Sequence, residues 1–128
     1  MLPRFAEINQ LCDTVRETSF AMHRYFRSGH LEKVYENRLT NRLRKQGITV
    51  MQQHPLPVRD EDGSLVGDYF ADLFVDHLLI VELKAARAVT NEHQAQILGY
   101  LRASQMPHGL LINFGAEKFY IKKFILSP

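Results

Sequence analysis

From residue 69 to residue 84 the chain reads Tyr69-Phe70-Ala71-Asp72-Leu73-Phe74-Val75-Asp76-His77-Leu78-Leu79-Ile80-Val81-Glu82-Leu83-Lys84. Val, Ile, Leu and Phe dominate this run, as they do in strands that are covered on both faces. Three charged residues, Asp72, Glu82 and Lys84, interrupt it. A charge inside an apolar strand is costly unless it is paired or holds a metal. We therefore expect a hairpin of two strands in which something compensates these charges.

The length of the turn decides where the charges lie. A turn through residues 76–78 would place Asp72 opposite Glu82, and Lys84 would share their face because alternate residues of a strand point the same way. A two-residue turn would put the carboxylates on opposite faces, so a shared site requires a loop of odd length. The charged face would also carry Phe70, Phe74 and Ile80, and the other face would be wholly apolar, formed by Ala71, Leu73, Val75, Leu79, Val81 and Leu83.

Carboxylates on adjacent strands are suitable ligands for Mg²⁺ or Mn²⁺, which prefer oxygen ligands and usually retain water. A lysine beside them, here Lys84, could orient or help deprotonate a metal-bound water. The alternative is a buried ion pair between Lys84 and Asp72 or Glu82, with no metal.

Composition limits the class of protein. The chain has 128 residues, of which 45% are hydrophobic and 23% charged, which is typical of one soluble domain. The net charge of +2 permits nucleic-acid binding without requiring it. The single cysteine, Cys12, fits a reducing compartment, so we expect a cytoplasmic protein. No apolar run is long enough to span a membrane, and no phosphate-binding loop, zinc-protease or serine-hydrolase motif occurs.

The hydrophobic pattern predicts a mixed sheet flanked by helices, in the order α-α-β-β-β-β-α-β-β. The strand that ends at Lys84 should pair in parallel with a later strand, through a right-handed helical crossover. The prolines of the 54–58 segment suit a sheet edge or a strand end. In chain order, the expected elements are helices over 5–26 and 31–46, a strand over 48–53, an extended segment over 54–58, a turn over 60–63, the hairpin from 65 onward, a helix over 91–104, and strands over 109–115 and 118–126.

Several helical residues could join the carboxylates. The third helix, capped by Thr90, places His93, Gln96 and Tyr100 on one side. Gln96 could bond a phosphate or a metal-bound water, and Tyr100 could orient a carboxylate. An ordinary polar helix flank is the alternative, and it is favoured for His93.

Two features of the second helix have alternative interpretations as well. Glu32 is either a third carboxylate of the site or an acid placed favourably at a helix start. Arg38, Arg42 and Lys45 form a basic row that either meets a phosphate backbone or is a solvated charged face.

The segment Gly29-His30-Leu31-Glu32-Lys33-Val34-Tyr35 matches a Gly-x-x-Glu-x-x-Tyr signature. In this the chain resembles the GxxExxY proteins, a branch of the PD-(D/E)XK nuclease superfamily. The likeness also covers Gln53, Val66-Gly67, Ala71-Asp72-Leu73, Val81-Glu82-Leu83-Lys84-Ala85, Gln96, Tyr100-Leu101 and Gly109-Leu110-Leu111-Ile112-Asn113-Phe114-Gly115.

The resemblance implies an α/β, restriction-endonuclease-like core over residues 29–128, preceded by an extra N-terminal helix in residues 1–28. Asp72, Glu82 and Glu32 match the superfamily's metal-binding carboxylates, with the Leu83 carbonyl as a further ligand, and Lys84 matches its catalytic lysine. Ala71 stands where many members have proline before the first acid, which removes nothing chemical. Gln96 with Tyr100 resembles the Gln-x-x-x-Tyr motif of RecB-type nucleases.

We therefore expect a Mg²⁺- or Mn²⁺-dependent nuclease that binds nucleic acid, DNA before RNA, with Gln96, Tyr100, Arg38 and Arg42 contacting the substrate. Two alternatives remain. One is a non-catalytic nucleic-acid-binding or partner-docking module that retains the nuclease fold. The other is a homodimeric scaffold held together by the amphipathic first helix.

Overall fold

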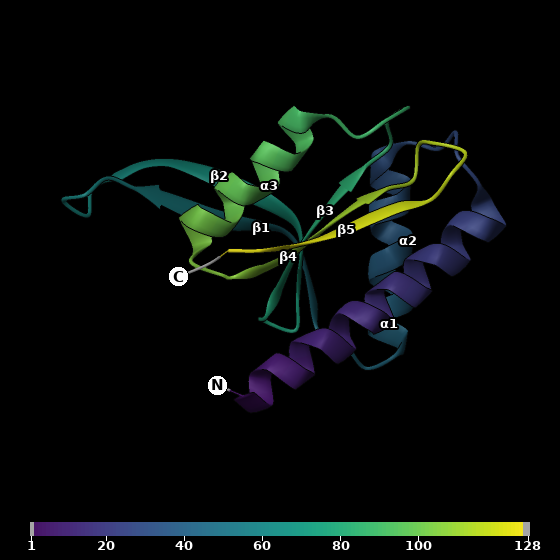
Figure 1. Ribbon diagram of the computed structural model, residues 1–128, viewed down its shortest axis with the longest axis horizontal. Coiled ribbons are helices and arrows are strands. Elements are labelled where there is room, and N and C mark those ends of the chain that lie inside the picture. Colours follow the sequence, from purple (N-terminus) through teal and green to yellow (C-terminus); the bar gives the residue numbers. More distant parts are fainter. Residues whose placement is uncertain (1, 127–128) are drawn as a thin grey trace.

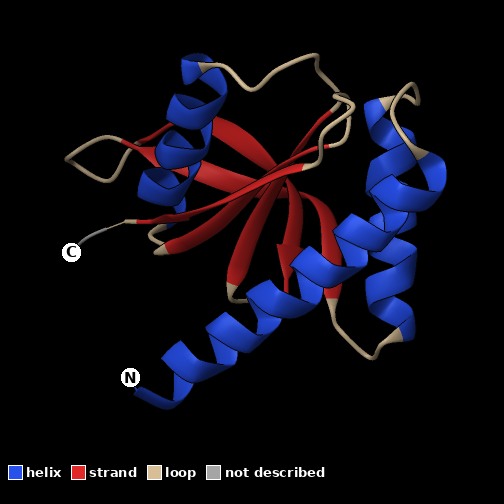
Figure 2. Ribbon diagram, turned by 45° about the vertical axis from the view of Figure 1, so that its right-hand side comes forward, coloured by secondary structure: helices blue, strands red, loops and turns tan. Residues whose placement is uncertain are grey.

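A single mixed sheet with helices on both faces forms the described part of the chain, residues 2–126 of the computed structural model, with side chains described from residue 6 (Figures 1 and 2). Five strands lie in the order β1-β2-β3-β4-β5. Only β3 and β4 pair in parallel, as predicted; their neighbours are antiparallel. The elements are α1 (Leu2–Phe26), α2 (Glu32–Lys45), β1 (Val50–Arg59), β2 (Leu65–Val75), β3 (Leu79–Lys84), α3 (Asn91–Ser104), β4 (His108–Asn113) and β5 (Tyr120–Ile125).

The sheet separates two hydrophobic cores, which explains why its central strands are apolar on both faces. Along β3, Leu79, Val81 and Leu83 pack against the core beneath α1 and α2. Ile80 points the other way, into the core beneath α3. The alternation predicted for this strand is thus confirmed.

The first helix uses its apolar stripe within its own chain. Ile8, Leu11, Val15 and Met22 are buried in the core that α1 shares with α2 and the sheet. A homodimer held together by this stripe therefore loses its basis. Among the residues described, no helix is both long and apolar enough to cross a lipid bilayer.

The turn between β2 and β3 has the odd length that a shared site requires. Val75 pairs with Leu79, so three residues form the loop, and the amide of Leu78 donates to the Val75 carbonyl over 3.0 Å. Asp76 and His77 both adopt left-handed conformations, with φ of 54° and 57°. The predicted register of the hairpin is confirmed.

The order of elements contains one strand fewer than expected before α3. The strand over 48–53 and the extended segment over 54–58 are one continuous strand, β1, at the edge of the sheet. Pro55 and Pro57 are two residues apart, so both missing N–H groups face the same side, and an edge strand tolerates this on its solvent side. The prediction of a sheet edge is confirmed, and the extra strand was wrong.

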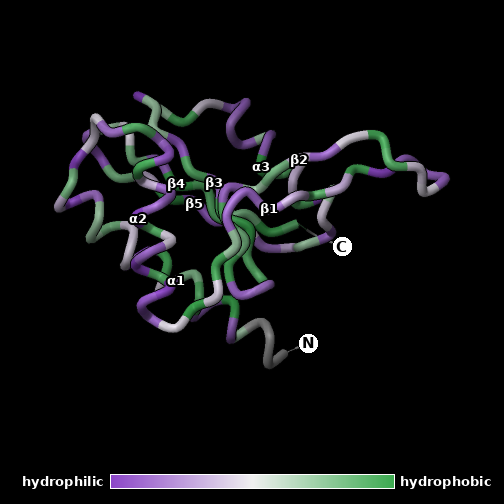
Figure 3. Tube along the Cα trace, turned by 180° about the vertical axis from the view of Figure 1, so that it is seen from behind, coloured by the Kyte–Doolittle hydropathy of each residue, from purple (hydrophilic) through white to green (hydrophobic). Residues whose placement is uncertain are grey.

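The expected alternation along β2 fails just before Asp72. Ala71 packs with Leu56 in the core beneath α3 instead of joining Leu73, and Phe70 is 51% exposed. The neighbouring strand is irregular at the same level, where Gln53 has a left-handed φ of 49°. The pairing register is nevertheless kept, since Gln52 pairs with Leu73 and His54 with Ala71. The hairpin of β1 and β2 then projects beyond the sheet with a hydrophilic tip (Figure 3).

The carboxyl end of β3, where Lys84 lies, is fixed by the side chain of Asn113. Its Oδ1 accepts from the amides of Ala86 and Gly115, both at 3.0 Å, and its Nδ2 donates to the Ala86 carbonyl over 2.9 Å. The Phe114 amide also donates to the Lys84 carbonyl over 2.9 Å. The loops after β3 and β4 are thereby held together.

This close approach predicts a large effect of adding one methyl group at Gly115. A Cβ there would lie 2.2 Å from the Ala86 nitrogen and 2.3 Å from the Ala85 carbonyl carbon, and backbone cannot move aside cheaply. We expect Gly115→Ala to lower the free energy of unfolding by about 3 kcal/mol in urea titrations. Gly99→Ala is the matched control, because a Cβ at that helical position meets no atom within 4 Å. It should stabilise by about 0.5–1 kcal/mol; similar effects of the two changes would contradict the clamp.

Candidate active site

Two carboxylates on adjacent strands each accept a hydrogen bond from a backbone amide of the opposite strand. The Asp72 amide on β2 donates to Glu82 Oε1 over 2.9 Å, and the Leu83 amide on β3 donates to Asp72 Oδ2 over 2.8 Å. These reciprocal bonds follow from the three-residue turn, which brings residues 72 and 82 opposite each other. The structure thus brings together the two acids that the sequence singled out.

Burial dominates the electrostatics of this pair. Glu82 is only 3% exposed, and burial, followed by the charge of Asp72, raises its pKa from 4.5 to about 9. Burial also raises the pKa of Asp72, although the hydrogen bond from Leu83 opposes this. Without a cation, Glu82 therefore keeps its proton at neutral pH. A nearby divalent ion would reverse this balance by favouring the charged forms.

The donor set matches the chemistry of Mg²⁺ or Mn²⁺. Across the part of the chain that the structure describes, no three or more His, Cys, Asp and Glu side chains converge closely enough to hold an ion by themselves. Mg²⁺ is commonly bound by one or two carboxylates and retains several waters, so the pair of Asp72 and Glu82 fits this ion.

Lys84 lies beside the acids without forming an ion pair with them. Its Nζ donates to Gln96 Oε1 over 2.8 Å, and Gln96 Nε2 donates to the Tyr100 hydroxyl over 3.0 Å. The ion pairs described among residues 6–126 include Arg16–Asp13 and Lys33–Glu36, and none of them involves Lys84. The alternative of a buried lysine–carboxylate pair is therefore wrong, although the charge of Lys84 still lowers the pKa values of both acids.

Tyr100 completes this chain of side chains on α3. Burial raises the pKa of its hydroxyl first, and the charges of Glu82 and Asp72 raise it further. Its ring also lies 5.1 Å from that of Tyr69 on β2. Gln96 and Tyr100 thus stand next to the carboxylates, as their spacing on the helix predicted.

Glu32 begins α2 within electrostatic reach of the same centre. Although the residue is exposed overall, burial of its carboxyl raises its pKa, followed by the charge of Asp72, while Lys84 opposes the shift. Two features stabilise the turn that precedes Glu32. Gly29 takes a φ of 104°, and the buried Tyr35 donates its hydroxyl to the Arg27 carbonyl over 2.6 Å and accepts from the His30 amide.

Sequence reasoning missed Glu36, one turn after Glu32. It is 3% exposed, and its two oxygens accept from Gln53 at 2.9 Å, from Gln52 at 2.7 Å and from Lys33 at 2.8 Å. Its charge contributes to the raised pKa values of Asp72 and Glu32. The spacing of four residues from Glu32, which puts both on one side of the helix, was the signal that could have found it.

Three other candidates lie elsewhere. The guanidinium groups of Arg38 and Arg42 lie 3.4 and 5.6 Å from the ring centre of Phe26, the last residue of α1. Both arginines are on the side of α2 that points away from Glu36. Their contact with a substrate stays a prediction. His93 Nδ1 accepts from the Thr90 amide over 3.1 Å and completes a capping box, so the structural interpretation favoured for it is confirmed.

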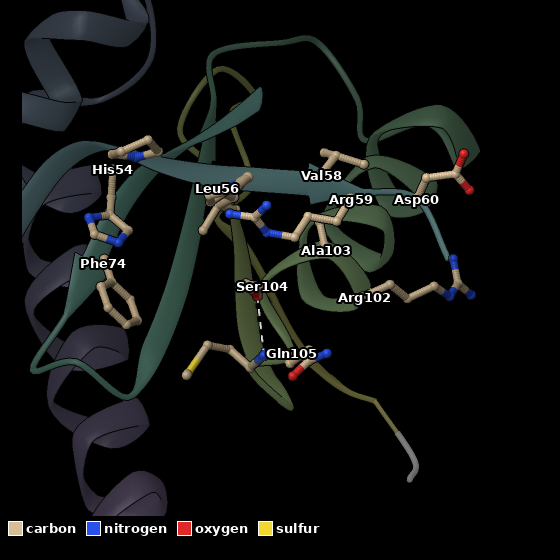
Figure 4. Close-up of a pocket in the computed structure, with 13 residues that line it drawn as sticks. His54, Leu56, Val58, Arg59, Asp60, Phe74, Arg102, Ala103, Ser104 and Gln105 are labelled. Carbon is tan, nitrogen blue, oxygen red and sulfur yellow. Dashed lines mark hydrogen bonds between the residues drawn. The ribbon is translucent and has the colours of Figure 1, made fainter. Parts of the chain in front are cut away.

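A separate groove of about 580 Å³ lies between β1 and the end of α3 (Figure 4). His54, Leu56, Phe74 and Arg102 are among its lining residues, and neither Asp72 and Glu82 nor Lys84 and Gln96 border it. This groove and the charged centre thus lie at different places on the fold.

The comparisons with known proteins give one match. A family model described as the PD-(D/E)XK nuclease superfamily matches residues 9–124. No curated protein and no solved structure gives a significant match. The matched range extends across every element from α2 to β4 and includes all the acids described above.

The burial of Glu82 predicts how stability changes with pH in metal-free protein. Its pKa is about 9 when folded and 4.5 when unfolded, so only the folded state holds the proton between these values. The contribution of Glu82 to stability should therefore be fully present below the lower value and fall by up to about 1.4 kcal/mol per pH unit as the pH rises toward the upper one. Glu82→Gln removes this dependence and keeps the acceptor for the Asp72 amide.

The measurement is urea unfolding in EDTA at pH 5, 7 and 9. We expect the variant to gain stability relative to wild type as the pH rises. Glu117→Gln, at an exposed position, should keep the wild-type profile. Parallel profiles for wild type and Glu82→Gln would show that Glu82 is already charged at neutral pH.

Proposed function

The chain belongs to the PD-(D/E)XK nuclease superfamily, and from this membership and the site geometry we propose a nuclease that hydrolyses phosphodiester bonds with Mg²⁺ or Mn²⁺. The observation that carries the proposal is the pair of reciprocally bonded carboxylates with a lysine beside them that is not paired to either. DNA is the proposed substrate before RNA.

We assign the metal to the oxygens of Asp72 and Glu82, with the Leu83 carbonyl as a further ligand. Glu32 is proposed as an accessory ligand that acts through a metal-bound water, because the three acids do not converge on one point. These oxygens come from two adjacent strands and the start of α2, and they suit a hard cation that retains water. When bound, a divalent ion supplies positive charge to the scissile phosphate and increases the acidity of water.

Lys84 holds and orients the attacking water or the scissile phosphate through its ammonium group. An ammonium has three donors, and Gln96 accepts one of them. Tyr100 fixes the Gln96 carboxamide in turn, so that Lys84 points consistently in one direction. The substrate would be held chiefly through its phosphates, with Gln96 and Tyr100 near the reacting group and Arg38 and Arg42 further out.

The finer assignment is to the GxxExxY branch. Its support is that each signature residue has a physical role, since Gly29 allows the turn, Tyr35 anchors it, and Glu32 lies within electrostatic reach of Asp72. Residues 1–128 are proposed to form one nuclease-like domain, because α1 shares the core of α2 and the sheet and the family match begins inside α1. The single, buried Cys12 supports a reducing, cytoplasmic location.

The alternative is a nucleic-acid-binding or partner-docking module without catalysis. Against it stands the buried Glu82, which has no ion-pair partner among the described residues. A sheet with a purely structural role would gain stability from an apolar residue at this position.

Cleavage of labelled single- and double-stranded DNA and RNA tests the proposal. We expect cutting with Mg²⁺ or Mn²⁺ and none in EDTA. Lys84→Ala and Glu82→Gln should each lower the rate about 100-fold or more, since each removes a group that acts on the reacting atoms.

Lys122→Ala is the matched control. This lysine also donates to a glutamine of α3, Gln94, over 2.8 Å, but it lies on β5, two strands away from β3. It should keep the wild-type rate. A wild type that never cuts, yet binds nucleic acid as well as Glu82→Gln does, would support the binding module instead.

A further inference from the structure

Two consecutive residues of β1 direct their side chains to the same partner. Gln52 Nε2 donates to Glu36 Oε2 over 2.7 Å, and Gln53 Nε2 donates to Glu36 Oε1 over 2.9 Å. In a regular strand neighbouring side chains point to opposite faces. The left-handed φ of 49° at Gln53 is what allows both to reach α2.

This conformation is costly for a residue other than glycine. A left-handed backbone is unfavourable for a residue with a side chain, and such strain persists only where surrounding contacts enforce it. Gln53 lies inside a continuous ten-residue strand, not in a turn. Strain of this kind tends to collect at functional sites.

The contacts of the two glutamines differ in one respect. Gln53 Nε2 also donates to Asp72 Oδ1 over 3.1 Å, whereas Gln52 Nε2 donates to Asn37 Oδ1 over 2.8 Å. The other oxygen of Asp72 accepts from the Leu83 amide. The Asp72 carboxylate is therefore held from two sides, by the backbone of β3 and by the side chain of Gln53.

The Gln53 carboxamide is itself held in place by its hydrogen bond to Glu36. Glu36 is buried and is fixed independently by Gln52 and Lys33. An amide nitrogen has two hydrogens, and Gln53 directs one to each of two carboxylates. The bridge keeps these like charges at a set separation and fixes the direction of the Asp72 oxygens.

We propose that Gln53 is a positioning residue for the divalent-ion site. Its carboxamide holds the Asp72 carboxylate in the ligating orientation by bridging it to Glu36. This inference rests on the proposed function, which assigns the ion to Asp72. A hydrogen bond to a metal-ligating carboxylate commonly changes metal affinity 10–100-fold. The strained backbone at Gln53 is the structural cost of that bridge.

The test compares Mn²⁺ affinity, measured by calorimetry, with unfolding free energy in EDTA. Gln53→Gly removes the carboxamide and adopts the left-handed backbone without strain. We expect it to bind Mn²⁺ about 10-fold or more weakly while its stability in EDTA stays at or above that of wild type. Gln53→Asn keeps an amide and tolerates this backbone, but it is too short to bridge both acids, so its affinity should fall as well.

Gln52→Ala is the matched control, because it removes a neighbouring bond to Glu36 and leaves the contact with Asp72 intact. Its stability should fall while its Mn²⁺ affinity stays within about 3-fold of wild type. If wild type binds Mn²⁺ and both Gln53→Gly and Gln53→Asn bind it equally tightly, this inference is overturned while the proposed function stands. Equal losses in Gln52→Ala would also overturn it, by showing a general packing effect. A wild type that binds no Mn²⁺ would overturn the proposed function and this inference together.

Discussion

The hydrogen bonds that the Asp72 and Glu82 carboxylates each accept from a backbone amide of the opposite strand are the interaction on which the rest of the site depends. Each carboxylate accepts an amide of the opposite strand, so neither can move without breaking the hairpin. The bonds also leave Glu82 buried and Asp72 half-buried, with no cationic side chain within 4 Å of either among the described residues. Only a rigid sheet, packed on both faces, can hold two such groups in place.

The two faces of the sheet contribute different chemistry to this centre. The face covered by α2 provides acids and amides: Glu32, Glu36 and the glutamines of β1. The face covered by α3 provides Gln96 and Tyr100, which hold Lys84. The β2–β3 hairpin joins the two sets, since Asp72 on β2 accepts from Gln53 and Lys84 on β3 donates to Gln96. The clamp of Asn113 on the loop after β3 then fixes the position of Lys84.

The parts of this arrangement that follow from local patterns could be predicted from the sequence. The odd-length turn set the register of the hairpin, Thr90 marked the start of α3, and the prolines of β1 indicated a sheet edge. The bridge through Gln53 could not be predicted, because a left-handed residue inside a strand is usually signalled by glycine or asparagine, and glutamine gives no such signal. The packing of Ala71 with Leu56 could not be predicted either, because it departs from the regular alternation at the same level of the sheet.

The direction of Lys84 favours a working site over a structural ion pair. A sheet selected only for stability would place this ammonium against the nearest carboxylate, where each charge would compensate the other. Instead Lys84 donates to a neutral glutamine, while Glu82 remains buried with a raised pKa. The strained Gln53 lies on the other side of the same acids. Two unfavourable features within one hydrogen-bonded cluster are best explained by a group that compensates both, and a divalent cation bound by Asp72 and Glu82 would do so.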